Sequence, residues 1–260
     1  MLLFFSIPII AVAVVFEFSL RNIPNDYRYK KQFLDQNAKN IEVLFLGSSH
    51  AYYGINPKYM QSKSFNAASI SQTLEYDLNI LKKYRNDWKN LKYVVLPVDY
   101  FSLFSRLDFG VENWRTKNYV IYYGMDSNFD PRHRFEIFAN QTKYNFERFR
   151  NYYVHQKSDL NVTRLGWGNR YQAAESLNLS EMGIVAAQRH RSVSKESFFA
   201  ENIKTLDTIA DFCKKRNIKL ILFTSPAYKT YVKNIDARQM NRTINVLEAF
   251  AASNKSVRYY

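Results

Sequence analysis

The 260-residue sequence predicts an α/β fold with a mainly parallel sheet, an N-terminal transmembrane helix and a long aromatic-rich insertion. Three observations lead to this prediction. Short apolar runs alternate with segments whose apolar residues recur at helical spacing, as in parallel sheets joined by crossover helices. The first 20 residues contain one charged side chain, and residues 101–197 are rich in Tyr, Phe and Trp but contain no clear strand.

The N-terminal segment, residues 1–20, is expected to be a transmembrane anchor or signal-anchor. Residues 2–20 are apolar apart from Glu17 and have no polar stripe, and about 20 such residues cross a bilayer as a helix. A cleaved signal peptide is the alternative, although no small-x-small cleavage site follows. Residues 21–40 are expected to form a juxtamembrane linker. Their basic side chains would keep the following chain in the cytoplasm by the positive-inside rule, unless a basic segment precedes residue 1.

Residues 41–260 are expected to form the α/β domain. The run 41–46 is apolar apart from Glu42 and leads into Gly47, which is typical of a strand buried on both faces. The run 93–98 has the same character, with Pro97 near its end, where a strand tolerates proline. Further strands are predicted at 64–67, 219–224 and 257–260, and helices at 71–84, 198–216 and 237–252. The long insertion, at about 101–197, separates the third strand from the helix at 198–216.

The net charge of +14 is spread along the chain, and no run of like charge exceeds the three residues 214–216. Nucleic-acid binding would require a basic stripe with stacking aromatic residues, so this spread argues against it. Cys213 is the single cysteine, which excludes an internal disulfide and a thiolate metal cluster. We expect no metal and no cofactor, and the sequence indicates no oligomeric state.

The stretch Gly47-Ser48-Ser49-His50 directly follows the first predicted strand. Glycine permits a sharp turn out of the strand. Ligands bind beyond the carboxyl ends of the strands in parallel α/β sheets, so these polar residues are expected at a cleft. A serine held there can act as a nucleophile, and its backbone N–H can stabilise an oxyanion.

The wider pattern resembles the SGNH (GDSL-like) hydrolase superfamily, within it a membrane-anchored bacterial branch of unassigned function. The similarity covers nearly the whole chain outside the insertion. The matching blocks are Arg21 to Tyr27, Leu46-Gly47-Ser48-Ser49-His50, Tyr53-Gly54-Ile55-Asn56-Pro57, Phe65-Asn66-Ala67-Ala68, Ser71-Gln72, Tyr76-Asp77, Tyr100 to Phe104 and Thr224 to Tyr231.

This resemblance implies a flavodoxin-like three-layer α/β/α fold and assigns roles to several residues. Ser49 is the expected nucleophile and also an oxyanion-hole donor, and Ser48 stands where aspartate is usual. Ala68 takes the place of a glycine whose N–H contributes to the oxyanion hole. Asp99 stands where the family has an asparagine that completes the hole, and a carboxylate there would repel an oxyanion. Asn66 is a possible substitute for that asparagine.

The family also places its catalytic Asp-x-x-His after the last strand, whereas this sequence ends at Tyr260. The catalytic histidine and aspartate are therefore expected beyond the given residues. Of the histidines present, His190 could reach the cleft, and His50 lies in the same turn as Ser49. His133 and His155 are expected on the surface. The expected cleft residues besides the nucleophile are Ser48, His50, Asp99 and His190.

Two functions follow from this reading of the sequence. The first is a membrane-anchored serine esterase or O-acyl transferase that acts on an acylated glycan or lipid of the cell envelope. The second is a non-catalytic scaffold or glycan-binding module that keeps the sheet and uses the cleft and the aromatic insertion. In both, the expected partners are the bilayer, through residues 2–20, and a cell-surface polysaccharide. The α/β domain is expected to be extracytoplasmic.

Overall fold

The computed structural model describes residues 2–126, 130–170 and 178–260, without the side chains of residues 2–6. These residues form two compact units. The first unit comprises Met1–Phe33 and Glu112–Asn161, and the second comprises Leu34–Val111 and Val162–Tyr260. The predicted insertion is therefore shared between the two units, because only its middle part belongs to the first.

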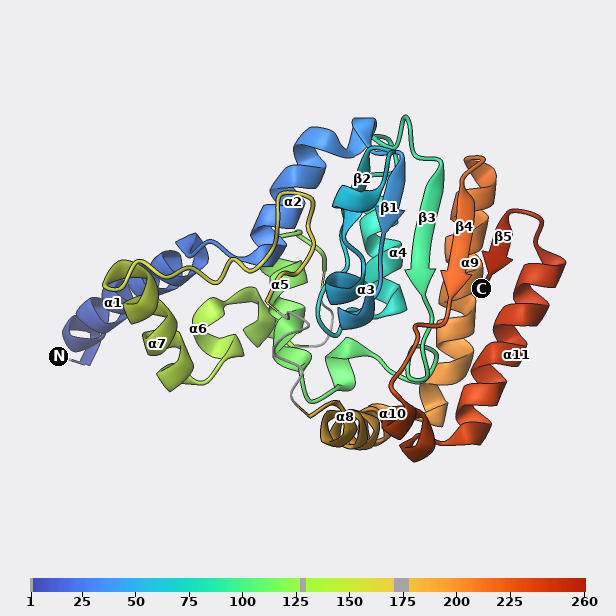
Figure 1. Cartoon of the computed structure of the whole chain (residues 1–260). Helices are drawn as coiled ribbons and strands as arrows, with labels where there is room; N and C mark the ends of the chain where they lie inside the picture. Colours follow the sequence, from blue (N-terminus) through green and yellow to red (C-terminus); the bar gives the residue numbers. More distant parts are fainter. Residues whose placement is uncertain (1, 127–129, 171–177) are drawn as a thin grey trace. The chain divides into compact units, whose positions relative to one another are not determined.

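The second unit is built on a five-stranded sheet in the order β2-β1-β3-β4-β5, in which all neighbouring strands are parallel (Figure 1). This order is typical of flavodoxin-like folds. The strands are β1 (Val43–Phe45), β2 (Ser64–Asn66), β3 (Tyr93–Pro97), β4 (Lys219–Phe223) and β5 (Val257–Tyr259). All five lie within the segments predicted from the sequence.

Helices connect and cover these strands. Leu44, Leu96 and Leu220 have no exposed surface, which explains the continuous apolar runs of their strands. The connecting helices are α3 (Ser49–Gly54), α4 (Leu74–Lys83), α9 (Phe199–Lys215) and α11 (Ala237–Ser253), and α8 (Leu179–Val193) and α10 (Lys229–Asn234) complete the unit. Helices α4 and α9 pack together on one face of the sheet (Figure 1). Both bury the apolar stripe that predicted them.

The edge strand β2 is covered by the loop at residues 162–168. The N–H of Asn66 donates to the carbonyl oxygen of Leu165 at 2.9 Å. Gly166 has a φ of +83°, and a Cβ atom there would lie 2.1 Å from the Asn66 carbonyl oxygen. Because only glycine fits, the loop can approach the strand backbone closely and block further pairing at this edge.

The prediction of a transmembrane helix, and of a single-pass membrane protein with an extracytoplasmic domain, is wrong. Among residues 2–126, 130–170 and 178–260, no helix has both the length and the apolar character of a membrane span. Helix α1 (Leu2–Asn22) instead packs on α6 (Glu136–Ala139) and α7 (Thr142–Tyr153) of its own unit. The Glu17 carboxylate accepts the backbone N–H groups of Glu136 and Ile137, both at 3.0 Å. The one charge that interrupts the apolar run is thus a specific internal contact.

The first unit also contains α5 (Thr116–Ile121) and most of α2 (Asp26–Asn37). The segment expected to be a linker is therefore largely helical. His133 of the same unit was expected on the surface but is only 6% exposed, because the 3-10 turn that contains it packs on α5 and α6. The interior of this unit holds a charge cluster, in which Glu136 contacts Lys117 and Arg148.

Candidate active site

The turn that leaves β1 is shaped by Gly47 and Ser48. Gly47 has a φ of +104°, and a Cβ atom there would lie 2.9 Å from the ring of Pro97 at the end of β3. Conformation and space therefore both require glycine. Ser48 is the N-cap of α3, and its side-chain oxygen accepts the N–H of His50 at 3.4 Å. Ser48, predicted as a cleft residue, is buried and fixes the start of the helix.

Ser49 is the first residue of α3 and is half-buried. It follows the carboxyl end of β1, the edge at which parallel α/β sheets bind ligands. Its N–H belongs to the first helical turn, where backbone N–H groups have no acceptor within the helix. The expected nucleophile thus lies at the ligand-binding edge of the sheet and is partly open to solvent.

His50 and Asp99 form a hydrogen-bonded pair at this edge. The Nδ1 atom of His50 lies 2.7 Å from Oδ2 of Asp99, which follows β3. The other carboxylate oxygen of Asp99 accepts the N–H of Ser225, after β4, at 2.9 Å. Asp99 is 4% exposed, so its orientation is fixed from both sides. A histidine whose Nδ1–H is held by a buried carboxylate presents Nε2 as a proton acceptor.

The environment of His50 makes it a stronger base than a free imidazole. Burial lowers the pKa of His50, but the hydrogen bond and the negative charge of Asp99 outweigh this effect. Arg189 opposes them by its positive charge. The net result is a pKa above the ordinary value, and the His50 side chain remains 31% exposed. Its ring is therefore anchored on one side and accessible on another.

Asn66 and Ala68, predicted as oxyanion-hole residues, contact each other instead of facing open space. The N–H of Ala68 donates to Oδ1 of Asn66 at 3.0 Å. The Asn66 amide nitrogen donates to the carbonyl oxygens of Ala51 and Ile55, both at 2.8 Å. These bonds tie the turn after β2 to α3. The Ala68 N–H and the Asn66 side-chain amide, both assigned to oxyanion binding, therefore already have acceptors in this structure.

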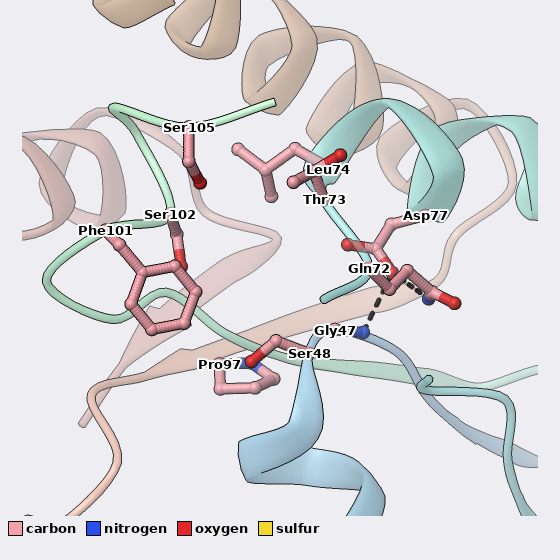
Figure 2. A pocket seen from close by; sticks show the side chains of 10 residues that line it. All are labelled: Gly47, Ser48, Gln72, Thr73, Leu74, Asp77, Pro97, Phe101, Ser102 and Ser105. Atoms are coloured by element: carbon pink, nitrogen blue, oxygen red, sulfur yellow. Dashed lines mark hydrogen bonds between the residues drawn. The ribbon is translucent and has the colours of Figure 1, made fainter. Parts of the chain in front are cut away.

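A buried carboxyl group, that of Asp77 on α4, is hydrogen-bonded to the backbone of the Gly47 turn. Its Oδ1 accepts the N–H of Gly47 at 2.8 Å and the side-chain amide of Gln72 at 2.5 Å. The carbonyl oxygen of Gly47 accepts the N–H of Ser69 at 3.1 Å. Both polar groups of the Gly47 residue are therefore bonded, which fixes the exit from β1. Figure 2 shows Asp77 and Gln72 beside the Gly47 nitrogen.

A small pocket of about 10 Å³ adjoins this contact (Figure 2). Gly47, Ser48, Asp77, Phe101 and Ser102 are among its lining residues. The volume corresponds to about one water molecule, so the pocket is too small for an acyl group. Asp77 thus acts on the turn and not directly on a substrate.

Asp77 makes the stability of the second unit depend on pH. Burial raises the pKa of Asp77 to about 7, although the hydrogen bonds from Gln72 and Gly47 lower it. The folded state therefore retains a proton that the unfolded chain, with an aspartate pKa of about 3.9, has lost. The free energy of unfolding should fall as pH rises from about 4 to about 7, by up to about 4 kcal/mol.

An Asp77→Asn variant should lose this pH dependence, because the amide is neutral throughout and can still accept the Gly47 N–H. Urea unfolding at a series of pH values measures the effect. Asp87→Asn, at an exposed carboxylate, is the matched control and should follow wild type. Parallel pH curves for wild type and Asp77→Asn would contradict the assignment.

His190, the remaining predicted cleft residue, lies on α8 near His50. The centroids of the two imidazole rings are 5.9 Å apart, and the ring of Phe101 contacts both. Nδ1 of His190 is hydrogen-bonded to the hydroxyl oxygen of Tyr231, at 2.8 Å. Tyr231, Phe101 and Ser225 were not predicted from the sequence as site residues. Phe101 and Ser225 lie in the loops after β3 and β4, and Tyr231 lies on α10. All three belong to the sequence blocks that carry the family resemblance, which was the signal available in the sequence.

Comparisons with known proteins give a faint likeness. No protein-family model and no curated protein matches the sequence. Among solved structures, the chain is similar to a Bacteroides fragilis protein proposed to be an acylhydrolase, with 13% identity and a TM-score of 0.36. The match covers 88% of this chain and 74% of that chain. The resemblance to the SGNH superfamily therefore rests on the sequence blocks alone.

Proposed function

We propose that this chain is a serine-type ester hydrolase or O-acyl transferase with Ser49 as its nucleophile. The observation that carries the proposal is the hydrogen-bonded pair of His50 and Asp99 beside Ser49. A serine hydroxyl requires a base to accept its proton, usually a histidine oriented by a carboxylate. Here all three residues belong to adjacent strand ends, those of β1 and β3.

In the proposed reaction, the Ser49 oxygen attacks the carbonyl carbon of an ester and its proton passes to Nε2 of His50. Successive side chains on a helix diverge by about 100°, so we propose that one water molecule carries this proton. Asp99 stabilises the resulting imidazolium. The proton then moves to the departing alkoxide as its bond to the carbonyl carbon breaks. Water, or the hydroxyl of an acceptor, releases the acyl group from Ser49 by the reverse sequence.

The substrate class follows from the family resemblance, which implies an acylated glycan or lipid. The site favours an ester over an amide for a separate reason. The His50–Asp99 pair can protonate an alkoxide leaving group. The side-chain amide of Asn66 and the N–H of Ala68, however, already have acceptors and so do not stabilise an oxyanion. Less oxyanion stabilisation is tolerable for an ester, because its carbonyl is the more reactive of the two.

A second candidate, a non-catalytic module that binds a polysaccharide, is favoured by the same contacts of Asn66 and Ala68. With these donors occupied, the cleft would bind a polar polymer and not accelerate its hydrolysis. The two candidates differ in whether the Ser49 hydroxyl reacts covalently.

A fluorophosphonate probe tests the proposal, because it labels serine hydroxyls that are activated by a base. The full chain should be labelled, and Ser49→Ala should abolish labelling. Ser48→Ala is the matched control: it removes a hydroxyl one residue away and costs about 1 kcal/mol of capping, but should keep the labelling. Mass spectrometry of the labelled peptide identifies the modified serine. If the folded full chain remains unlabelled, the enzyme proposal fails and the binding module is favoured.

A further inference from the structure

Helices α8 and α10 pack closely against each other beside the candidate site. Gly183 of α8 lies so close to α10 that a Cβ atom there would be 2.4 Å from Oγ1 of Thr230 and 3.0 Å from the nitrogen of Tyr231. The Thr230 hydroxyl donates to the carbonyl oxygen of Ser180 at 2.8 Å. This close contact fixes Tyr231 relative to the residues of α8.

Tyr231 in turn fixes the ring of His190. The hydroxyl of Tyr231 and Nδ1 of His190 are 2.8 Å apart, and the two residues are 8% and 9% exposed. A buried imidazole with one nitrogen bonded cannot rotate without losing that bond. The position of the His190 ring is therefore set by a contact that lies outside the Ser49, His50 and Asp99 group.

The fixed ring of His190 lies against the residues that surround His50. Its centroid is 4.3 Å from that of Phe101 and 5.9 Å from that of His50, and Phe101 and His50 meet edge to face at 5.6 Å. The three rings form one packed cluster. Asp99 holds His50 by a hydrogen bond, and the rings of Phe101 and His190 pack against the His50 ring.

The charges around the cluster allow His50 to accept a proton. Burial, together with the charges of His50 and Arg189, lowers the pKa of His190 to about 3, against the opposite effect of Asp99. Tyr231, by contrast, has a raised pKa because it is buried near Asp99 and Tyr100. Both groups are consequently neutral at physiological pH. A neutral His190 does not repel the imidazolium that forms when His50 takes up a proton.

We propose that His190, held by Tyr231, is a positioning residue that keeps the imidazole of His50 on Asp99. The inference rests on the proposed function for its catalytic meaning, because His50 is the base in that reaction. It assigns a role to helices α8 and α10, which the catalytic step itself does not use. Loosening this contact should let the His50 ring leave Asp99 and should lower the turnover number without changing the substrate-binding constant.

Nuclear magnetic resonance of the histidine Cε1–H groups tests this without any assay of activity. In wild type, His50 should titrate above the ordinary pKa of about 6.5 because of Asp99. In Tyr231→Phe and in His190→Leu, the pKa of His50 should fall by about one unit, as expected when an imidazole loses a carboxylate partner. Tyr228→Phe is the matched control, because it removes the hydroxyl of an exposed tyrosine three residues before Tyr231 and leaves both rings in place. Its His50 titration should match wild type.

The activity measurement is separate. In Tyr231→Phe and in His190→Leu, kcat for a simple acyl ester should fall about 10- to 100-fold with KM unchanged, as for a misplaced catalytic group. If wild type shows no activity and no probe labelling, while the His50 titration responds as described, the proposed function fails and the positioning role stands. If the pKa of His50 is the same in wild type, Tyr231→Phe and His190→Leu, the positioning role is overturned. His190→Leu provides the test if Tyr231→Phe does not fold.

Discussion

An Asp99→Asn variant is expected to lose about 10³- to 10⁴-fold in kcat for an acyl ester, the size of effect seen when a catalytic histidine loses its carboxylate. The introduced amide would keep an oxygen for the N–H of Ser225, so the loop after β4 should hold its conformation. The NH₂ group of that amide, however, would donate to Nδ1 of His50. The ring proton would then lie on Nε2, and His50 could no longer accept a proton from Ser49.

Steady-state kinetics over a range of pH measure this effect. In wild type the activity should rise with pH through a pKa above about 6.5, because the raised pKa of His50 governs the acid limb. Asp211→Asn, at an exposed carboxylate on α9, is the control and should behave as wild type. Full activity in a folded Asp99→Asn protein would exclude the His50–Asp99 pair as the base.

Replacing Glu136 by Leu is expected to lower the free energy of unfolding of the first unit by about 3–5 kcal/mol, the usual cost of removing one member of a buried ion pair. Glu136 has no exposed surface, and its carboxylate binds Lys117, Arg148 and the hydroxyl of Tyr122. Burial raises its pKa, but the charges of Lys117 and Arg148 outweigh this and lower the pKa to about 2. Without Glu136, Lys117 would lose the carboxylate that it contacts while remaining buried, whereas Arg148 would keep Asp159 at 2.6 Å.

Hydrogen exchange followed by mass spectrometry in increasing urea resolves the two units. Peptides from α5 and α7 should lose protection in Glu136→Leu, whereas peptides from β3 and β4 report on the second unit. The double variant Glu136→Leu/Lys117→Met removes both charges and should recover part of the lost stability. Equal protection of α5 in wild type and in Glu136→Leu would show that the cluster contributes little.

The sheet could be predicted because each strand carries its own signal. Residues 43–46 before Gly47 and the run ending at Pro97 are apolar throughout, and strands buried on both faces require this wherever they lie in the sheet. The helix over Phe199–Lys215 shows a stripe of apolar residues for the same local reason. These patterns depend on neighbouring residues alone, so the sequence contains them in full.

The misread features depend on contacts between distant parts of the chain. The first 20 residues are apolar apart from Glu17, and the bonds of Glu17 to residues near 136 exist only in the folded unit. His50 and Asp99 were both expected in the cleft, but the hydrogen bond between them follows from the adjacency of β1 and β3. The order of the strands in the sheet cannot be predicted from either segment. The fixed ring of His190 likewise depends on a tyrosine 41 positions later.

The discontinuous first unit has a consequence for how the protein is made on the ribosome. Glu17 and its partner at residue 136 are 119 positions apart, so helix α1 leaves the exit tunnel long before α6 and α7 exist. At roughly 5–20 residues per second, the delay is roughly 6–24 s. Throughout that interval the Glu17 carboxylate lacks the two backbone N–H groups that it accepts in the folded unit. Helix α1 can therefore complete its contacts with α6 and α7 only after the later helices have emerged.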